Sequence, residues 1–288
     1  MNSLPIGIFD SGVGGLTVYR ALHECLPSEH FVYLGDTARV PYGTKSLATV
    51  ERYGIENAKF LESHGIKLLV VACNTASALA LPAIRDALKV PVIGVIEPGA
   101  RAAVAVAAGK TIGVIATEAT VKSGAYSTAI ERIDSTVEVI ERACPLFVPL
   151  AEEGWADTGV ARAVAEQYLV DFKEQNLGAL VLGCTHYPIL RELISEVVGA
   201  HVPLIDSGEA AASEVRTLLE SSELEGQPTA KESATGDVAE RQLCDDLDHF
   251  YVTDAAERFA KVAERFLGMS PSVLEAVEVW GHDELRTN

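Results

Sequence analysis

Short runs of valine, isoleucine and leucine recur along the chain, and between them apolar residues return at the i, i+3, i+4 spacing. A short apolar run is typical of a strand that is buried on both faces, whereas the longer spacing is typical of an amphipathic helix. This alternation indicates βα units, in which helices cover a parallel sheet. We therefore predict an α/β protein that is built on parallel sheets.

The same pattern sets approximate bounds for each element. The predicted strands span residues 5–10, 30–35, 67–72, 91–96, 111–116, 137–142, 179–183 and 202–206. The predicted helices span residues 15–25, 46–64, 75–88, 160–175, 189–198, 209–220 and 255–267. The polar stretch 221–237 is expected to be an exposed loop, and the tail from residue 268 is expected to be peripheral.

Two pairs of strand ends carry nearly the same sequence. Segments 69–75 (LVVACNT) and 180–186 (LVLGCTH) each combine an apolar strand, a cysteine and small polar residues that open a helix. Segments 7–12 (GIFDSG) and 203–208 (PLIDSG) likewise place Asp-Ser-Gly at a strand end. Two similar halves explain both repetitions. Because open parallel sheets bind ligands at the carboxyl ends of their strands, facing halves would bring both cysteines to one cleft.

The cysteines are odd in number, scattered and never in a CxxC pair: Cys25, Cys73, Cys144, Cys184 and Cys244. We therefore expect free thiols rather than a disulfide framework or a structural zinc site. Cys73 and Cys184 each stand at a helix start, where free N–H groups and the helix dipole favour the thiolate. A lone cysteine is more often a small buried apolar residue, and we expect that of Cys25, Cys144 and Cys244.

Asp10 and His186 are candidate partners for the two thiols. Asp10 ends the first strand, where it could orient or deprotonate a thiol or, alternatively, cap a helix. His186 lies two residues beyond Cys184 and could serve as its acid or base, or could be a loop histidine without chemistry. A metal site made of Cys73, Cys184, His186 and Asp10 has acceptable ligand types, but its spacing is unlike short-range zinc patterns. We therefore assign no metal.

The glycine-rich turn 10–17 lies between a strand and a helix but does not fit a dinucleotide site. A GxGxxG pattern that begins at Gly12 requires glycine where Thr17 stands, and no P-loop lysine follows. The turn is therefore either a tight βα connection or a set of backbone N–H groups for a carboxylate. In the loop 35–43, Asp36 and Arg39 are expected to pair with each other or with neighbours.

An acidic pair follows two prolines in the segment 145–153. Glu152 and Glu153 form either an exposed acidic turn or a carboxylate near the cleft, and the sequence leaves both interpretations open.

Size and charge narrow the function classes. The chain has 288 residues and 30.6 kDa, enough for one large domain or two ordinary ones. Its formal net charge of −18 excludes charge-driven binding to nucleic acid or to an anionic membrane surface. The uncharged stretch 68–84 is too short and too polar to span a membrane. The first residues lack the features of a signal peptide, so a cytoplasmic location is expected.

Five segments together closely resemble bacterial glutamate racemases: 7–16 (GIFDSGVGGL), 35–43 (GDTARVPYG), 72–76 (ACNTA), 121–126 (VKSGAY) and 183–188 (GCTHYP). The resemblance runs from about residue 5 to 268, whereas the two cysteine motifs alone also suit the wider aspartate/glutamate racemase superfamily. It implies an isomerase that interconverts L- and D-glutamate without a cofactor and supplies D-glutamate for peptidoglycan. It also implies two pseudo-symmetric α/β domains, residues 1–97 plus 207–288 and residues 98–206, with the active site between them.

The resemblance further assigns roles to individual residues. Cys73 would act on one enantiomer with help from Asp10, and Cys184 on the other with help from His186, while Glu152 matches a further acidic position. Together with Asp10 and His186, neutral donors would hold the amino and carboxylate groups of the substrate: Ser11, Tyr42, Gly43, Asn74, Thr75 and Thr185. Thr117 and Thr120 are additional candidates.

Two other functions remain open from the sequence. One is an aspartate-specific racemase of the same superfamily, which differs in the length of side chain that its pocket accepts. The other is a ligand-binding or metal-dependent protein with silent cysteines, an interpretation that leaves the duplicated cysteine context unexplained. The sequence does not determine the oligomeric state, for which a homodimer is one candidate.

Overall fold

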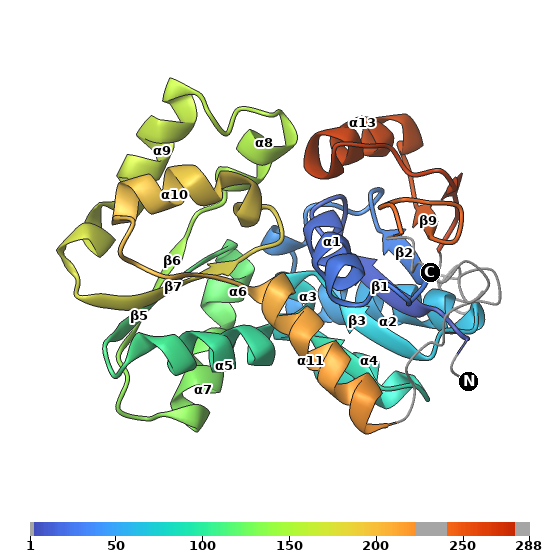
Figure 1. Ribbon diagram of the computed structural model, residues 1–288, viewed down its shortest axis with the longest axis horizontal. Helices are drawn as coiled ribbons and strands as arrows, with labels where there is room; N and C mark the ends of the chain where they lie inside the picture. Colours follow the sequence, from blue (N-terminus) through green and yellow to red (C-terminus); the bar gives the residue numbers. More distant parts are fainter. Residues whose placement is uncertain (1–2, 223–240, 280–288) are drawn as a thin grey trace, which may run out of the picture.

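The computed structural model describes residues 3–222 and 241–279 of the chain. Within these ranges the strands form a six-stranded and a four-stranded sheet, and every strand pair is parallel (Figure 1). The larger sheet has the order β10 (Leu274–Ala276), β9 (His249–Val252), β2 (Phe31–Gly35), β1 (Ile6–Asp10), β3 (Leu68–Val71) and β4 (Val92–Gly94). The smaller has the order β6 (Val139–Ala143), β5 (Thr111–Ala116), β7 (Leu177–Gly183) and β8 (Leu204–Asp206). The predicted α/β class is confirmed.

Helices connect the strands and cover both sheets. Those of the first part of the chain are α1 (Leu16–Cys25), α2 (Leu47–Ser63), α3 (Asn74–Leu79), α4 (Leu81–Ala87) and α5 (Ile96–Ala107). The middle of the chain forms α6 (Glu118–Ser123), α7 (Ala125–Ile133), α8 (Phe147–Glu152), α9 (Gly159–Leu169) and α10 (Arg191–Val198). The last two are α11 (Ser207–Ser221) and α13 (Ala256–Leu267), and short 3-10 turns occupy Tyr42–Thr44, Val170–Glu174 and Tyr187–Leu190.

Strands β1, β3 and β7 are buried on both faces, which is why their sequences are almost continuously apolar. On one face of the larger sheet, Ile8 packs in a cluster with Tyr19 of α1 and Phe259 of α13. On the other face, Phe9 packs with Leu61 of α2. Adjacent strand residues point to opposite sides, so one short run of sequence supplies both layers.

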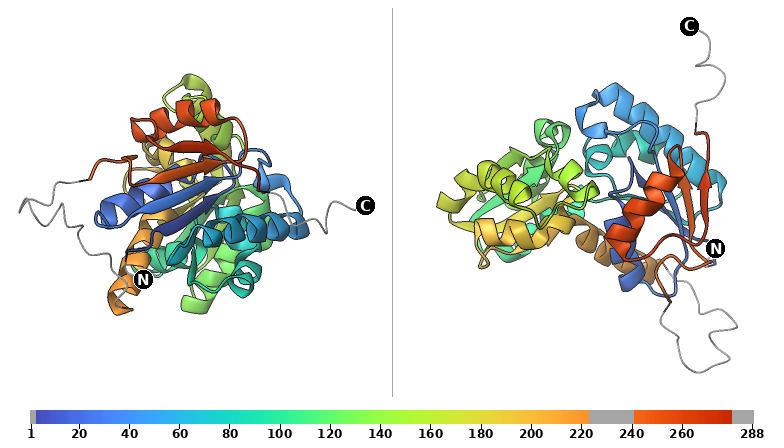
Figure 2. Two further views of the ribbon diagram at one scale, coloured as in Figure 1. Left: turned by 90° about the vertical axis from the view of Figure 1, so that its right-hand side faces the viewer. Right: turned by 90° about the horizontal axis from the view of Figure 1, so that it is seen from above.

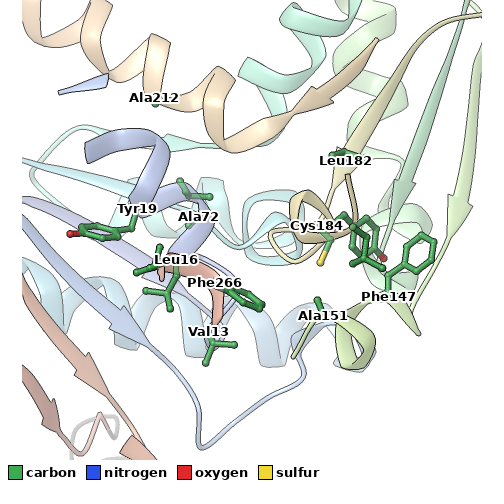
Figure 3. Packing of buried hydrophobic residues seen from close by; sticks show 14 of the residues in the cluster. Val13, Leu16, Tyr19, Ala72, Phe147, Ala151, Leu182, Cys184, Ala212 and Phe266 are labelled. Carbon is green, nitrogen blue, oxygen red and sulfur yellow. The ribbon is translucent and has the colours of Figure 1, made fainter. Parts of the chain in front are cut away.

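One apolar cluster reaches both sheets. The cluster that holds Ile8 also includes Phe147 of α8 and Leu182 of β7, and Figure 3 shows Val13 and Phe266 opposite Ala151 in this region. The far face of the smaller sheet is covered separately by α5 and α7. The two halves therefore share a continuous core. The second view of Figure 2 shows them as two lobes side by side.

The chain crosses between the sheets twice. It leaves the larger sheet through α5 after β4, and it returns through α11 after β8. Helix α11 packs against both α1 and α5 and lies between the lobes in Figure 1. Because the two crossings lie next to each other, the carboxyl ends of both sets of strands face one another.

All eight predicted strands are present with ends shifted by a few residues, but two short strands on one side of the larger sheet, β9 and β10, were not predicted. The prediction also missed α5 to α8. Helix α5 is rich in alanine, which gives weak contrast between its faces, and α6 and α7 are separated by Gly124 in the left-handed conformation.

The remaining helix predictions need smaller corrections. The single helix expected over 75–88 is two helices that meet at Ala80, since Pro82 in the first turn of α4 lacks an N–H and restarts the helix. The helix expected over 160–175 ends at Leu169 and continues as a 3-10 turn. The tail after residue 268, expected to be peripheral, adds β10 to the sheet edge. The loop prediction 221–237 lies, beyond Ser222, outside the described residues.

Gly178 offers a test of how closely helix α5 packs against strand β7 of the smaller sheet. A Cβ on Gly178 of β7 would lie 2.3 Å from the carbonyl oxygen of Ala107, a backbone atom that cannot move aside. We expect Gly178→Ala to lower the free energy of unfolding by about 1–3 kcal/mol, measured by urea denaturation. The control Gly159→Ala opens α9 where a Cβ meets nothing within 4 Å, and it should leave stability unchanged or slightly higher. Equal midpoints for the two variants would contradict the packing argument.

Candidate active site

A cavity of about 220 Å³ lies between the lobes, where the carboxyl ends of four strands meet. Ser11 follows β1, Cys73 follows β3, Thr117 follows β5 and Cys184 follows β7, and all four line the cavity. The two cysteines therefore face one space from opposite sheets, as the repeated sequence pattern predicted. Figure 3 shows the Cys184 side chain at the inner edge of its lobe.

Most of the predicted site residues line this cavity: Ser11, Tyr42, Gly43, Cys73, Asn74, Thr75, Thr117, Glu152, Cys184, Thr185 and His186. Asp10 and Thr120 do not line it, because both are fully buried behind residues that do. Sequence reasoning did not assign a role to the remaining lining residues: Gly12, Val40, Pro41, Thr44, Glu118, Pro145, Val148 and Pro149. Several of these belong to α6 and α8, the helices that the periodicity did not reveal.

Cys73 caps the first turn of α3. Its sulfur accepts a hydrogen bond from the N–H of Ala76 at 3.5 Å and donates one to Ser11 Oγ at 3.4 Å. Burial, together with the nearby charge of Asp10, raises the pKa of the Cys73 thiol to about 12. The expectation that a helix start would favour the thiolate is therefore wrong for Cys73, because α3 has only six residues and desolvation outweighs it.

Asp10 lies beneath Cys73 with no exposed surface. Its Oδ2 accepts a hydrogen bond from the N–H of Gly12 at 2.9 Å, whereas its Oδ1 has no hydrogen-bond partner among the described residues. Burial raises the pKa of Asp10, although the charge of His186 and the neighbouring backbone N–H groups act in the opposite direction. When Asp10 is ionised, it adds negative potential on the Cys73 side of the cavity.

Cys184 begins a chain of polar contacts. Its sulfur lies 3.9 Å from His186 Nδ1, and His186 Nε2 lies 3.1 Å from Glu152 Oε1. Burial alone would lower the pKa of His186, but the contacts with Cys184 and Glu152 outweigh burial and raise it to about 10. Burial acts to raise the pKa of Glu152, yet His186 and Arg258 hold it below its usual value. The His186 imidazolium, paired with the Glu152 carboxylate, therefore lies next to Cys184. Of the two interpretations of the acidic pair 152–153, the structure supports a carboxylate near the cleft, since Glu152 lines the cavity.

The loop after β2 is held by a buried polar network. Asp36 accepts hydrogen bonds from Arg39 Nε at 2.7 Å and from Asn57 Nδ2 at 3.1 Å, which confirms the expected Asp36–Arg39 pair. The Tyr42 hydroxyl also donates to Asp36, so this hydroxyl is already engaged. Tyr42 and Gly43 can thus offer the cavity backbone groups rather than the phenol.

Another part of the cavity wall is built from neutral groups. Asn74 Nδ2 donates to Tyr126 at 2.9 Å and to Ser207 at 3.1 Å, which leaves Asn74 Oδ1 buried without a partner among the described residues. The hydroxyls of Thr75 and Thr117 lie 2.9 Å apart. The wall therefore presents hydroxyls and an amide, which suit the polar ends of an amino acid.

The other cysteines lie outside the cavity, and all five are free thiols, as expected. Within the described ranges, no group of three or more His, Cys, Asp or Glu side chains has the arrangement of a metal site. Among the helices that the structure describes, none is long and apolar enough to cross a membrane.

Comparison with known proteins identifies the class. Residues 6–215 match the family described as Asp/Glu/Hydantoin racemase, so the chain belongs to this family of racemases. The glutamate racemase of Geobacter metallireducens is 52% identical over 263 residues, which cover 91% of this chain and 92% of that protein. The predicted family and the prediction of an isomerase are confirmed.

Solved structures of glutamate racemases agree with this family assignment. Glutamate racemase isoform RacE1 from Bacillus anthracis has a TM-score of 0.88 at 36% identity and covers 97% of this chain and 99% of its own. Glutamate racemase from Francisella tularensis, determined in complex with D-glutamate, has a TM-score of 0.84 at 39% identity with the same coverage. The two-domain α/β fold with the cavity between its lobes is therefore confirmed.

The charge state of His186 can be measured directly. Its pKa is raised from 6.5 to about 10, so its imidazolium contributes stability below about pH 6.5, and this contribution is lost as the pH rises through 10. We expect NMR titration to find His186 protonated at pH 8, and Glu152→Gln to lower its pKa because the burial cost then lacks compensation. Glu153→Gln removes the same charge from an exposed neighbour and should leave the His186 titration unchanged. A neutral His186 at pH 7 would overturn the assignment.

Proposed function

We propose that this chain interconverts L- and D-glutamate by moving the Cα proton between Cys73 and Cys184 without a cofactor. The observation that carries the proposal is the pair of thiols at equivalent strand ends of two sheets, on one cavity. Each thiol also has its own ionisable neighbour, Asp10 for Cys73 and His186 for Cys184.

Inversion at a carbon centre requires a base on one face and an acid on the other. In one direction, the Cys184 thiolate takes the Cα proton, so that the C–H bond breaks and an S–H bond forms. Cys73, which burial keeps protonated at neutral pH, then delivers its proton to the opposite face of the carbanion. The other direction uses the same two groups in exchanged roles, and His186 can exchange a proton with Cys184.

Neutral groups hold the substrate in this proposal. Ser11, Thr75 and Thr185 offer hydroxyls to the carboxylates, and the unpartnered Asn74 Oδ1 can accept a hydrogen bond from the ammonium group. The complex of the Francisella tularensis enzyme with D-glutamate supports glutamate as the ligand. We propose in addition that Gly43 contributes through its backbone and that Thr117 closes the same wall.

The wider role rests on the resemblance. We propose that the D-glutamate formed supplies peptidoglycan synthesis, and that the domains are residues 1–97 plus 207–288 and residues 98–206. The membership of β1–β4, β9 and β10 in one sheet and of β5–β8 in the other supports this division. The cytoplasmic location and the homodimer stay predictions.

Removal of either catalytic thiol should stop racemisation. We expect Cys73→Ala and Cys184→Ala each to lower kcat by about a thousandfold or more, because neither face can then exchange its proton. Cys25→Ala is the matched control, since Cys25 is a free thiol outside the cavity, and it should keep wild-type turnover. Substantial activity in either cavity variant, measured by circular dichroism of the amino acid, would sink the two-base mechanism.

The substrate can be identified in deuterated water. Proton NMR of the metal-free protein with L-glutamate, D-glutamate or aspartate should show loss of the Cα proton signal for both glutamate enantiomers, together with loss of optical rotation. Exchange on aspartate alone would assign the chain to an aspartate-specific racemase. No exchange on either amino acid by folded protein would contradict catalysis and favour a binding protein with silent cysteines.

A further inference from the structure

The C-terminal helix α13 touches the Glu152–His186 pair in three ways. Arg258 Nη2 lies 3.3 Å from Glu152 Oε2, and Arg265 donates a hydrogen bond to the backbone carbonyl of Glu152. The ring of Phe266 packs edge-on against the imidazole of His186, with centroids 5.9 Å apart. Helix α13 therefore contacts the Glu152 side chain, the Glu152 backbone and the His186 ring that pairs with Glu152.

These contacts cross from one lobe to the other. Helix α13 packs with the larger sheet through Phe259, whereas Glu152 ends α8, which belongs to the smaller sheet. In Figure 1 the two helices face each other at the top of the molecule. The match to the racemase family ends at residue 215, so α13 lies outside the matched segment.

Each oxygen of the Glu152 carboxylate has its own partner. Oε1 contacts His186 Nε2 at 3.1 Å, and Oε2 contacts Arg258 at 3.3 Å. A glutamate side chain has several freely rotating bonds, and its orientation is fixed only when both oxygens are engaged. Without Arg258, the Oε2 edge is free to turn toward water, since the Glu152 side chain keeps 24% of its surface exposed.

We propose that Arg258 is a positioning residue of the racemase. From across the cleft it holds the Glu152 carboxylate on His186, and this keeps His186 in contact with Cys184. Because Arg258 and Glu152 belong to different lobes, Arg258 acts in this way only when the two lobes lie together. This inference rests on the proposed function for its kinetic consequence. The contact itself is a property of the fold and can be tested independently.

Other charged groups also act on His186, so the effect of Arg258 must be separated from theirs. The groups that act on His186 directly are Cys184 of its own loop, Glu152 of α8 and Asp10 of β1. Farther from the ring, Arg258 and Arg265 of α13 contact Glu152, and Glu153 contacts Arg258. Removing Arg258 takes away a positive charge, which by itself would favour the imidazolium. Loss of the Glu152 contact acts in the opposite direction. Glu152 touches the imidazole ring directly and Arg258 does not, so we expect the loss of Glu152 to dominate and the pKa of His186 to fall.

Arg258→Gln in the full-length chain tests the proposal. We expect kcat for both enantiomers to fall about tenfold with little change in KM, and the NMR titration of His186 to shift to lower pH. Thermal stability should hardly change, because the Arg258 side chain is 65% exposed and exposed ion pairs stabilise proteins little. Arg258→Lys, which restores a charge in the same place, should recover part of the activity.

Lys261→Gln is the matched control, since it removes one positive charge from the exposed face of α13, and Lys261 makes no hydrogen bond or ion pair with any described residue. Its kcat and its His186 titration should equal those of the wild type. Equal losses in the two variants would mean a general charge effect and would overturn the proposal, as would unchanged kcat and titration in Arg258→Gln. If the wild type does not racemise glutamate, the proposed function fails, and the His186 titration still decides whether Arg258 positions Glu152.

Discussion

The close approach of the turn after β1 to the loop after β7 is the contact on which the site depends. A Cβ on Gly14 would lie 2.2 Å from Thr185 Oγ1 and 2.4 Å from the ring of His186, so only glycine lets the two segments meet. Thr17 Oγ1 fixes the same contact by donating to the carbonyl of Thr185 at 2.8 Å. The glycine-rich turn, which could be interpreted as a ligand cradle, therefore serves chiefly to join the lobes at the cavity.

That contact gives two similar sequences opposite electrostatic surroundings. Cys73 lies above the buried carboxyl of Asp10, and burial and this charge raise its pKa to about 12. Cys184 lies instead beside His186, which Glu152 keeps as an imidazolium. The proposed mechanism needs one sulfur with a proton and one without. Although the two cysteine motifs are duplicated, their neighbours differ: a buried carboxyl at Cys73 and a histidine–glutamate pair at Cys184.

The sequence was sufficient to predict the cavity walls that stand at strand ends, because parallel strands present their carboxyl ends at one edge. Cys73 and Cys184 could be found in this way. Glu152 could not be decided, since its role depends on α8, a six-residue helix too short to show a periodic pattern. Arg258 was not predicted at all, because its partner is 106 positions away and nothing local records that contact. The engaged hydroxyl of Tyr42 was also missed, although its partner Asp36 is only six positions away, because the contact depends on how the irregular loop after β2 folds.

A net charge of −18 is compatible with an anionic substrate because the acidic groups at the cavity are compensated locally. Two carboxylates line it: Glu118 lies 3.5 Å from Lys122, and Glu152 is shared between His186 and Arg258. Charges elsewhere on the surface act through water and salt, which screen them beyond about 8 Å. Neutral donors that line the cavity act at contact distance, where hydrogen bonds to a carboxylate are strong. The contacts of Glu152 with His186 and Arg258, which orient His186 in the proposed mechanism, therefore also offset a charge that would oppose binding of an anion.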